Sequence, residues 1–171
     1  MKQMKLFGLL LLIFLVEGTI IPRLFNLADW GRLQAVPDFL LVTLLMVAFF
    51  ADATSAVLYG ILFGFLTDLV FTPVLGVYAF GMGFTVYLIY VLSKWLNTNA
   101  FVTTALSAIG VCLLQFQVYF IYLMIGVTDQ QIGEFLQWRL PVTIGLNVCF
   151  AIVAYYPFRH FLSGMKDRGS E

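Results

Sequence analysis

Residues 60–76 read GILFGFLTDLVFTPVLG, a stretch that places one carboxylate, Asp68, inside an apolar run behind two glycines. Gly60, Gly64 and Asp68 are spaced at i, i+4 and i+8, so an α-helix brings them to one face. Glycines on such a face let a second helix approach closely in a membrane, whereas an aspartate in hydrocarbon costs at least about 2.5 kcal/mol. We therefore interpret Gly60 and Gly64 as a helix-packing or partner-contacting seam, and Asp68 as a latch that fixes the turn toward Pro73 and Gly76.

The composition of the whole chain indicates that these helices lie in the hydrocarbon core of a membrane. Of its 171 residues 62% are hydrophobic and only 11% are charged, whereas soluble domains are roughly 45–50% apolar and about 25% charged. The formal net charge is zero, which gives no reason to expect nucleic acid or an acidic substrate as a partner. The sequence therefore predicts an all-α integral membrane protein that lies in the lipid bilayer, with residues 1–171 forming a single polytopic domain.

Apolar segments alternate with short polar or Gly/Pro-containing breaks and predict about six transmembrane helices. They lie near residues 6–21, 38–51, 54–71, 74–92, 101–126 and 139–158. The region 39–70 is too long for one helix across a hydrocarbon core of about 30 Å and short for two. With a break near Asp52–Ser55, it is either two short spans or a re-entrant hairpin.

The distribution of basic residues favours an even number of crossings with both termini in the cytoplasm. With this topology the inner set outnumbers the outer one: Lys2, Lys5, Lys94, Arg159, Lys166 and Arg168 lie inside, and Arg23, Arg32 and Arg139 lie outside. Trp95 would anchor the inner interface, and Trp30 and Trp138 the outer one. No Ala-x-Ala-like cleavage site follows the run Leu6–Val16, so we read it as an uncleaved first span rather than a secretory signal.

Three acidic residues, Glu17, Asp38 and Asp68, fall at one depth in this topology and form an outer-leaflet polar cluster. Each also has a structural interpretation. Asp38 follows Pro37 and would accept hydrogen bonds from the free N–H groups at its own helix start. Asp68 would accept them from the turn 69–74, and Glu17 would snorkel to the interface.

The remaining polar groups give no catalytic pattern. Gln115 and Asn147 are intramembrane amides, which more often tie helices together than bind ligands. Cys112 and Cys149 lie in apolar runs without CxxC spacing, and His160 is the single histidine. Because His160 lies in the basic end Phe158–Phe161, we expect no metal site, and we expect no cofactor. We also expect no enzymatic activity, since Asp38 and Asp68, the one possible catalytic pair, lack the Gly-x-Gly-Asp signature of membrane aspartyl proteases. Of the two longer connections, 22–37 reads as an interfacial loop, and 127–137 holds a capping-box-like start for a short outer helix.

Three motifs together resemble the bacterial rod shape-determining protein MreD family. They are Pro37-Asp38-Phe39-Leu40-Leu41, Gly60-x3-Gly64-x3-Asp68 and Pro73-x2-Gly76-x-Tyr78. Their order and spacing match, and the resemblance covers essentially the whole chain. It implies a non-catalytic scaffold of the lateral cell-wall elongation machinery in the bacterial cytoplasmic membrane. The partners it implies are the single-span protein MreC, the MreB filament, RodA and a class B penicillin-binding protein.

That family is in turn similar in architecture to the substrate-binding components of energy-coupling-factor transporters, which supplies an alternative function. In a small-solute-binding subunit of the vitamin type, five side chains would face a common outer cavity: Glu17, Asp38, Asp68, Gln115 and Tyr119. Against this alternative, Leu6–Val16 lacks the Ala-x3-Ala pattern that first spans of those components commonly present to their coupling partner.

Overall fold

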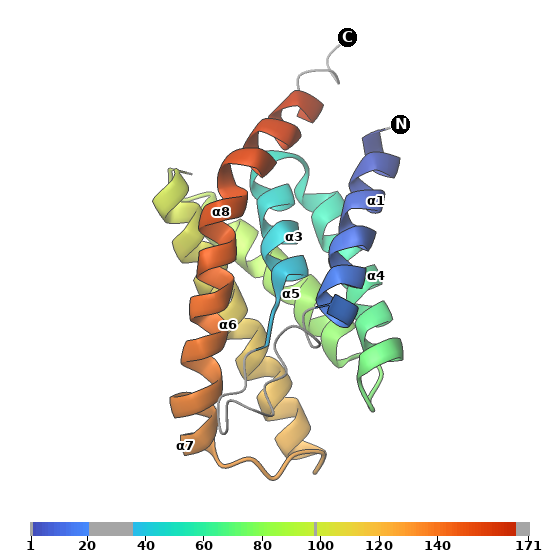
Figure 1. The fold of residues 1–171 in the computed structure, drawn as a ribbon, viewed down its shortest axis with the longest axis vertical. Helices are drawn as coiled ribbons and strands as arrows, with labels where there is room; N and C mark the ends of the chain where they lie inside the picture. Colours follow the sequence, from blue (N-terminus) through green and yellow to red (C-terminus); the bar gives the residue numbers. More distant parts are fainter. Residues whose placement is uncertain (1, 21–35, 98, 167–171) are drawn as a thin grey trace.

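The computed structural model describes residues 2–20, 36–97 and 99–166, and every regular element in these ranges is a helix (Figure 1). This confirms the all-α class. Arg23, Trp30, Arg32 and Arg168 lie outside the described residues, as does most of the predicted loop 22–37. The elements are α1 (Lys2–Leu15), η1 (Val16–Ile20), α3 (Phe39–Phe50), α4 (Ala53–Phe71), α5 (Val77–Ser93), α6 (Ala100–Met124), α7 (Ile132–Glu134), η3 (Phe135–Arg139) and α8 (Leu140–Lys166).

Each of the six apolar segments predicted from the sequence coincides with a helix. Three helical stretches are long and apolar enough to cross a membrane: Ala53–Phe71, Ala100–Met124 and Ile132–Phe161. The helices α3 and α5 are apolar but shorter. The short helix expected within 127–137 is not separate, because α7 and η3 run directly into α8 and lengthen it.

The uncertain region 39–70 forms two helices around a sharp turn at Ala51 and Asp52. The Asp52 Oδ2 atom accepts a hydrogen bond from the Ser55 N–H at 2.8 Å and caps the start of α4. This matches the break predicted at Asp52–Ser55. A carboxylate at a helix start is the favoured N-cap.

Helix α3 lies at the centre of the bundle. Its nine consecutive residues 40–48 are all buried, with at most 4% of any side chain exposed. It contacts α1, α4, α5, α6 and α8. A helix of 12 residues is only about 18 Å long, and α3 is shorter than α4, α6 and α8.

The helices run alternately up and down, so the bundle has two ends. The start of α1 and the end of α8 lie at the same end, together with the α3–α4 turn and the connection from α5 to α6 (Figure 1). The opposite end carries the α4–α5 turn and the connection from α6 to α8, and helix α3 begins nearer the middle of the bundle. An even number of passes therefore fits the described helices.

Helix α1 is held against α4 by aromatic rings. The Phe7 and Phe14 rings lie 5.6 and 6.0 Å from that of Phe63, and Phe14 lies 5.6 Å from Phe71. Tilted aromatic pairs stabilise a fold by more than the burial of their apolar surface alone. They bring η1, which follows α1, next to the start of α3.

Candidate functional site

Helices α4 and α5 approach each other along a seam of glycines. Gly60 and Gly64 are both buried against α5. A Cβ on Gly60 would lie 3.5 Å from the Gly83 backbone, an ordinary contact. A Cβ on Gly64 would lie 2.7 Å from the carbonyl carbon of Tyr78 and 2.8 Å from the Cα of Ala79, so no side chain fits there. The face read from the sequence is thus filled by this chain's own α5, and a partner cannot reach it without displacing α5.

Asp68 closes the turn at the end of this seam. Its carboxylate is fully buried and accepts the N–H groups of Gly76, Tyr78 and Ala79, each at 2.9 Å. The Thr72 hydroxyl donates to it at 3.3 Å. Asp68 therefore caps the start of α5 from the preceding helix, which satisfies N–H groups that no intrahelical partner can reach. The sequence placed its donors at residues 69–74, but the backbone donors lie further along the chain, at 76–79.

The turn itself requires Gly76. Its φ of +98° lies in the left-handed region, which only glycine adopts without strain. This conformation aims the Gly76 N–H back at Asp68. The motif that carried the resemblance, from Gly60 to Gly76, is therefore one structural unit.

The start of α3 is capped by a residue of another element. Asp38 stands at the N-cap position but makes no side-chain capping bond, so the expectation that it caps its own helix is wrong. Glu17, from η1, does this instead, because its Oε2 accepts the Leu40 N–H at 2.8 Å. Glu17 therefore points into the bundle and does not snorkel to the interface. No local sequence pattern links residues 23 positions apart, so the sequence did not predict this contact.

Asp38 takes part in a chain of polar groups that crosses the bundle. Its Oδ2 accepts a hydrogen bond from Gln115 Nε2 at 2.6 Å, and Gln115 Oε1 accepts one from Arg139 Nη2 at 3.4 Å. Asp38 is 1% exposed, and Gln115 thus links α3 to α6 and η3. Asp38 and Asp68 thus accept hydrogen bonds from different groups, Asp38 from Gln115 and Asp68 from the start of α5.

The extended segment Val36–Asp38 is joined to α8 by one amide. Asn147 Oδ1 accepts the Asp38 N–H at 2.9 Å, and Asn147 Nδ2 donates to the Val36 carbonyl at 3.1 Å. Thr143, one turn earlier, accepts the Val36 N–H at 3.0 Å. An amide side chain here replaces the neighbouring strand that an extended backbone would otherwise need. The sequence indicated Asn147 as a helix-tying amide but gave no sign of Thr143.

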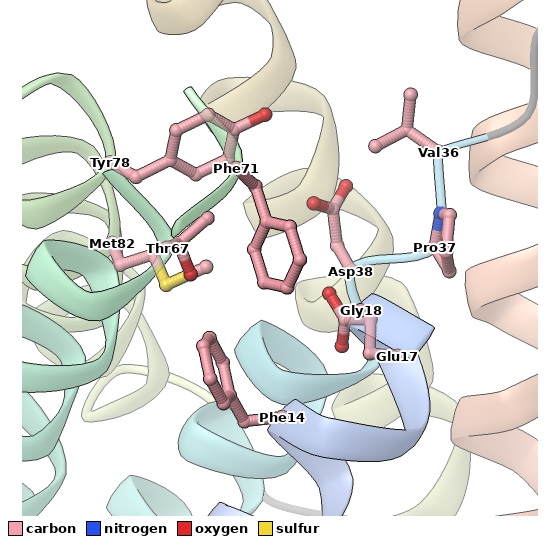
Figure 2. Close-up of a pocket in the computed structure, with 10 residues that line it drawn as sticks. All are labelled: Phe14, Glu17, Gly18, Val36, Pro37, Asp38, Thr67, Phe71, Tyr78 and Met82. Carbon is pink, nitrogen blue, oxygen red and sulfur yellow. The ribbon is translucent and has the colours of Figure 1, made fainter. Parts of the chain in front are cut away.

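A cavity of about 220 Å³ lies beside these residues, between α1, α4, α5 and the start of α3 (Figure 2). Of the five side chains expected to share an outer cavity, only Glu17 and Asp38 line it. Gln115 is turned toward Arg139, Asp68 toward α5, and Tyr119 donates to the Gln130 carbonyl at 2.9 Å. The complete lining is Phe14, Glu17, Gly18, Val36, Pro37, Asp38, Thr67, Phe71, Tyr78 and Met82. From the sequence, Tyr78 was noted only as part of the motif Pro73-x2-Gly76-x-Tyr78, and Thr67 was not predicted to line a cavity.

The described residues contain no group of three His, Cys, Asp or Glu side chains that could hold a metal ion. Cys112 and Cys149 are free thiols on α6 and α8. The polar groups of the bundle are mainly engaged in holding its helices and the extended segment together.

Comparison with known proteins gives a family match across nearly the whole chain. The model of the family described as rod shape-determining protein MreD matches residues 2–165. The rod shape-determining protein MreD of Bacillus subtilis (strain 168) is 38% identical over 130 residues, which cover 76% of this chain and 76% of that protein. No solved structure matches the chain.

Proposed function

The chain belongs to the MreD family of rod shape-determining proteins, and we propose that it is a non-catalytic membrane scaffold of the cell-elongation machinery. It would act through helix contacts with an MreC-like single-span protein and with the wall synthase, formed by RodA and a class B penicillin-binding protein. The MreB filament would be reached indirectly or through the cytoplasmic tails.

The observation that carries this proposal is the contrast between the interior and the surface of the bundle. Polar side chains of α3, α4 and α6 are used in internal hydrogen bonds. The exposed faces present large apolar side chains: Leu58, Ile61, Leu62, Phe65 and Leu69 on α4, Phe80, Phe84 and Tyr87 on α5, and Ile152, Val153 and Tyr156 on α8. Such faces can contact lipid or apolar helices of other membrane proteins.

An apolar groove lies on this surface between α4 and α5. Three small residues, Gly76, Ala79 and Gly83, form part of it, and the stacked rings of Phe80 and Phe84, 5.4 Å apart, line it further along α5. Small residues permit close backbone approach between membrane helices. We propose that the transmembrane helix of the MreC-like protein occupies this groove.

Co-purification of the solubilised chain with the MreC-like protein tests the groove. Ala79→Leu fills it and Phe84→Ala removes part of its lining, so we expect each variant to retain at most about a fifth of the wild-type partner. Val153→Leu changes an exposed residue of α8, 76% exposed, and should retain all of it. Full retention in both groove variants, with folded protein at wild-type levels, would contradict this site.

For the membrane topology we propose six passes in the bacterial cytoplasmic membrane, with both termini cytoplasmic. Basic side chains support this orientation: Lys5, Lys94 and Arg159 lie toward the end of the bundle where α1 starts and α8 ends, and Arg139 lies toward the other. Helix α3 is too short to cross about 30 Å of hydrocarbon alone. The extended segment before it is tolerated at depth because protein surrounds it.

Cysteine labelling tests this topology. In a background without Cys112 and Cys149, a cysteine at the exposed position Thr54 should react with an impermeant maleimide only after the membrane is opened. A cysteine at the exposed position Asp129, at the opposite end, should react in intact spheroplasts. Labelling of Thr54→Cys from outside would overturn the proposed orientation.

A further inference from the structure

The start of α5 takes part in two structures at once, the apolar groove on the surface and the polar interior of the bundle. Among the described residues that line the groove are Gly76, Ala79 and Phe80, which we call the turn end of the groove. Asp68 is not part of this lining, and its carboxylate is fully buried. One short piece of backbone therefore lies between a buried carboxylate and an exposed groove.

A single oxygen of that carboxylate holds both small residues of the turn end. Asp68 Oδ2 accepts the N–H of Gly76 and the N–H of Ala79, each at 2.9 Å. The other oxygen, Oδ1, accepts the Tyr78 N–H at 2.9 Å, and Tyr78 lines the cavity beside Glu17 instead of the groove. The Oδ2 atom is thus the one that fixes the backbone at the groove.

The backbone of the turn end depends on these hydrogen bonds. Gly76 has no side chain with which to pack, and its φ of +98° lies outside the helical region. The first N–H groups of a helix have no acceptor within the helix, and in a membrane an unpaired N–H group is costly. Loss of the Asp68 carboxylate should therefore shift Gly76 and Ala79, and the turn end of the groove with them.

The other end of the groove has a separate support. It is formed by three residues further along α5, which we call the far end: Gly83, Phe84 and Tyr87. Here α4 and α5 pack directly, since a Cβ on Gly60 would lie 3.5 Å from the Gly83 backbone. Positions 80 and 87 are about 10 Å apart along a helix. A change at Asp68 should therefore act on the turn end and leave the far end in place.

We propose that Asp68 is a positioning residue for partner binding. Its Oδ2 atom holds Gly76 and Ala79 where a transmembrane helix of the partner contacts the turn end. Close approach of two backbones at small residues requires that supporting hydrogen bonds hold those residues accurately in place. Asp68 acts through the backbone of α5 and does not touch the partner. This role rests on the groove proposed above as the binding site of the MreC-like protein.

Photo-crosslinking from the two ends of the groove tests this role. The photoreactive residue p-benzoylphenylalanine replaces either Phe80 or Tyr87, which are 60% and 57% exposed, in membranes that also contain the MreC-like protein. With Asp68 present, we expect a crosslink to that protein from both positions. With Asp68→Leu, the crosslink from position 80 should fall at least fivefold, and the crosslink from position 87 should stay within twofold.

A matched control separates positioning from a general loss of stability. Asn147→Leu removes buried hydrogen bonds of α8 and leaves the groove residues unchanged, so it should alter both crosslinks by the same factor. An equal fall from both positions in Asp68→Leu, or no fall at either, would overturn the positioning role.

Two further outcomes are decisive. Where Asp68→Leu does not fold, Asp68→Asn takes its place, because its NH₂ group faces at least one of the three N–H donors. This variant should lower the crosslink from position 80 alone, at least twofold, and an equal fall at both positions or none would overturn the role. Absence of both crosslinks with Asp68 present would refute the groove itself, and the role of Asp68 with it, so the two failures are distinguishable.

Discussion

The two glycines of the α4–α5 seam should respond differently to the same substitution. Alanine at Gly60 places its Cβ at 3.5 Å from the Gly83 backbone, whereas alanine at Gly64 places it at 2.7 Å from the Tyr78 carbonyl carbon. Alanine stabilises a helix by about 0.5–1 kcal/mol relative to glycine, and forcing an extra methyl group into a tight site costs about 1–3 kcal/mol.

From these values we expect Gly60→Ala to be neutral or stabilising by up to about 1 kcal/mol, because only the helix-propensity gain applies there. Gly64→Ala should be destabilising by about 1–2 kcal/mol, because the clash exceeds that gain. The clash also displaces Tyr78 and Ala79, whose N–H groups donate to Asp68. The strain at Gly64 would therefore weaken the cap of α5 as well.

The assay is unfolding in mixed micelles with increasing SDS, followed by circular dichroism. Gly145→Ala is the control for helix propensity, since a Cβ at Gly145 in α8 meets no atom within 4 Å. Equal stability of Gly60→Ala and Gly64→Ala, or a Gly64→Ala protein as stable as the Gly145→Ala control, would refute this reasoning. Larger side chains such as leucine would not separate the two sites, because they would clash at both.

Three further predictions concern single hydrogen-bonding groups. Asp68→Asn keeps one acceptor oxygen and should lose about 1–3 kcal/mol in the same unfolding assay, while Asp68→Leu leaves the N–H groups at the start of α5 unpaired and should lose more; equal losses would instead favour a required charge. Asn147→Leu unpairs the Asp38 N–H and the Val36 carbonyl and should lower the free energy of unfolding by about 2 kcal/mol or more. A smaller loss of stability than in Thr143→Val would contradict the role of Asn147 in holding the extended segment against α8. The hydrogen bonds from Ser55 hold the pKa of the Asp52 carboxyl below its ordinary value of 3.8, so its stabilising effect is present above that pH and is lost as pH falls through the lower, folded-state pKa. Asp52→Asn should remove this acid dependence from the thermal midpoint, and an unchanged pH profile would show that the cap does not contribute.

The chemistry of the polar cluster differs from what three acidic residues at one depth would indicate by themselves. Glu17 caps α3, Asp38 is bonded to Gln115, and Asp68 caps α5. Each carboxylate thus has a different structural partner, and only two of the three lie beside the cavity. Their separation explains why a shared site for all three does not form.

Local properties of the sequence determined the helical class, the positions of the helices and the turn at Asp52. These follow from apolar run length, glycine spacing and capping side chains, all of which act within a few residues. The Asp68 latch was also readable, because its donors lie within eleven residues of it. The family resemblance rested on this same local segment, together with Pro37–Leu41.

Only the tertiary structure decided which polar groups meet. Glu17 and Leu40 are 23 residues apart, Asp38 and Gln115 are 77 apart, and Asp38 and Asn147 are 109 apart. No periodicity connects such positions, because their contact depends on how the helices cross. The way α4 and α5 cross also decides that Gly60 has room for a methyl group and that Gly64 has none. The sequence therefore determined the elements and their capping residues, and helix packing decided which residues enclose the cavity.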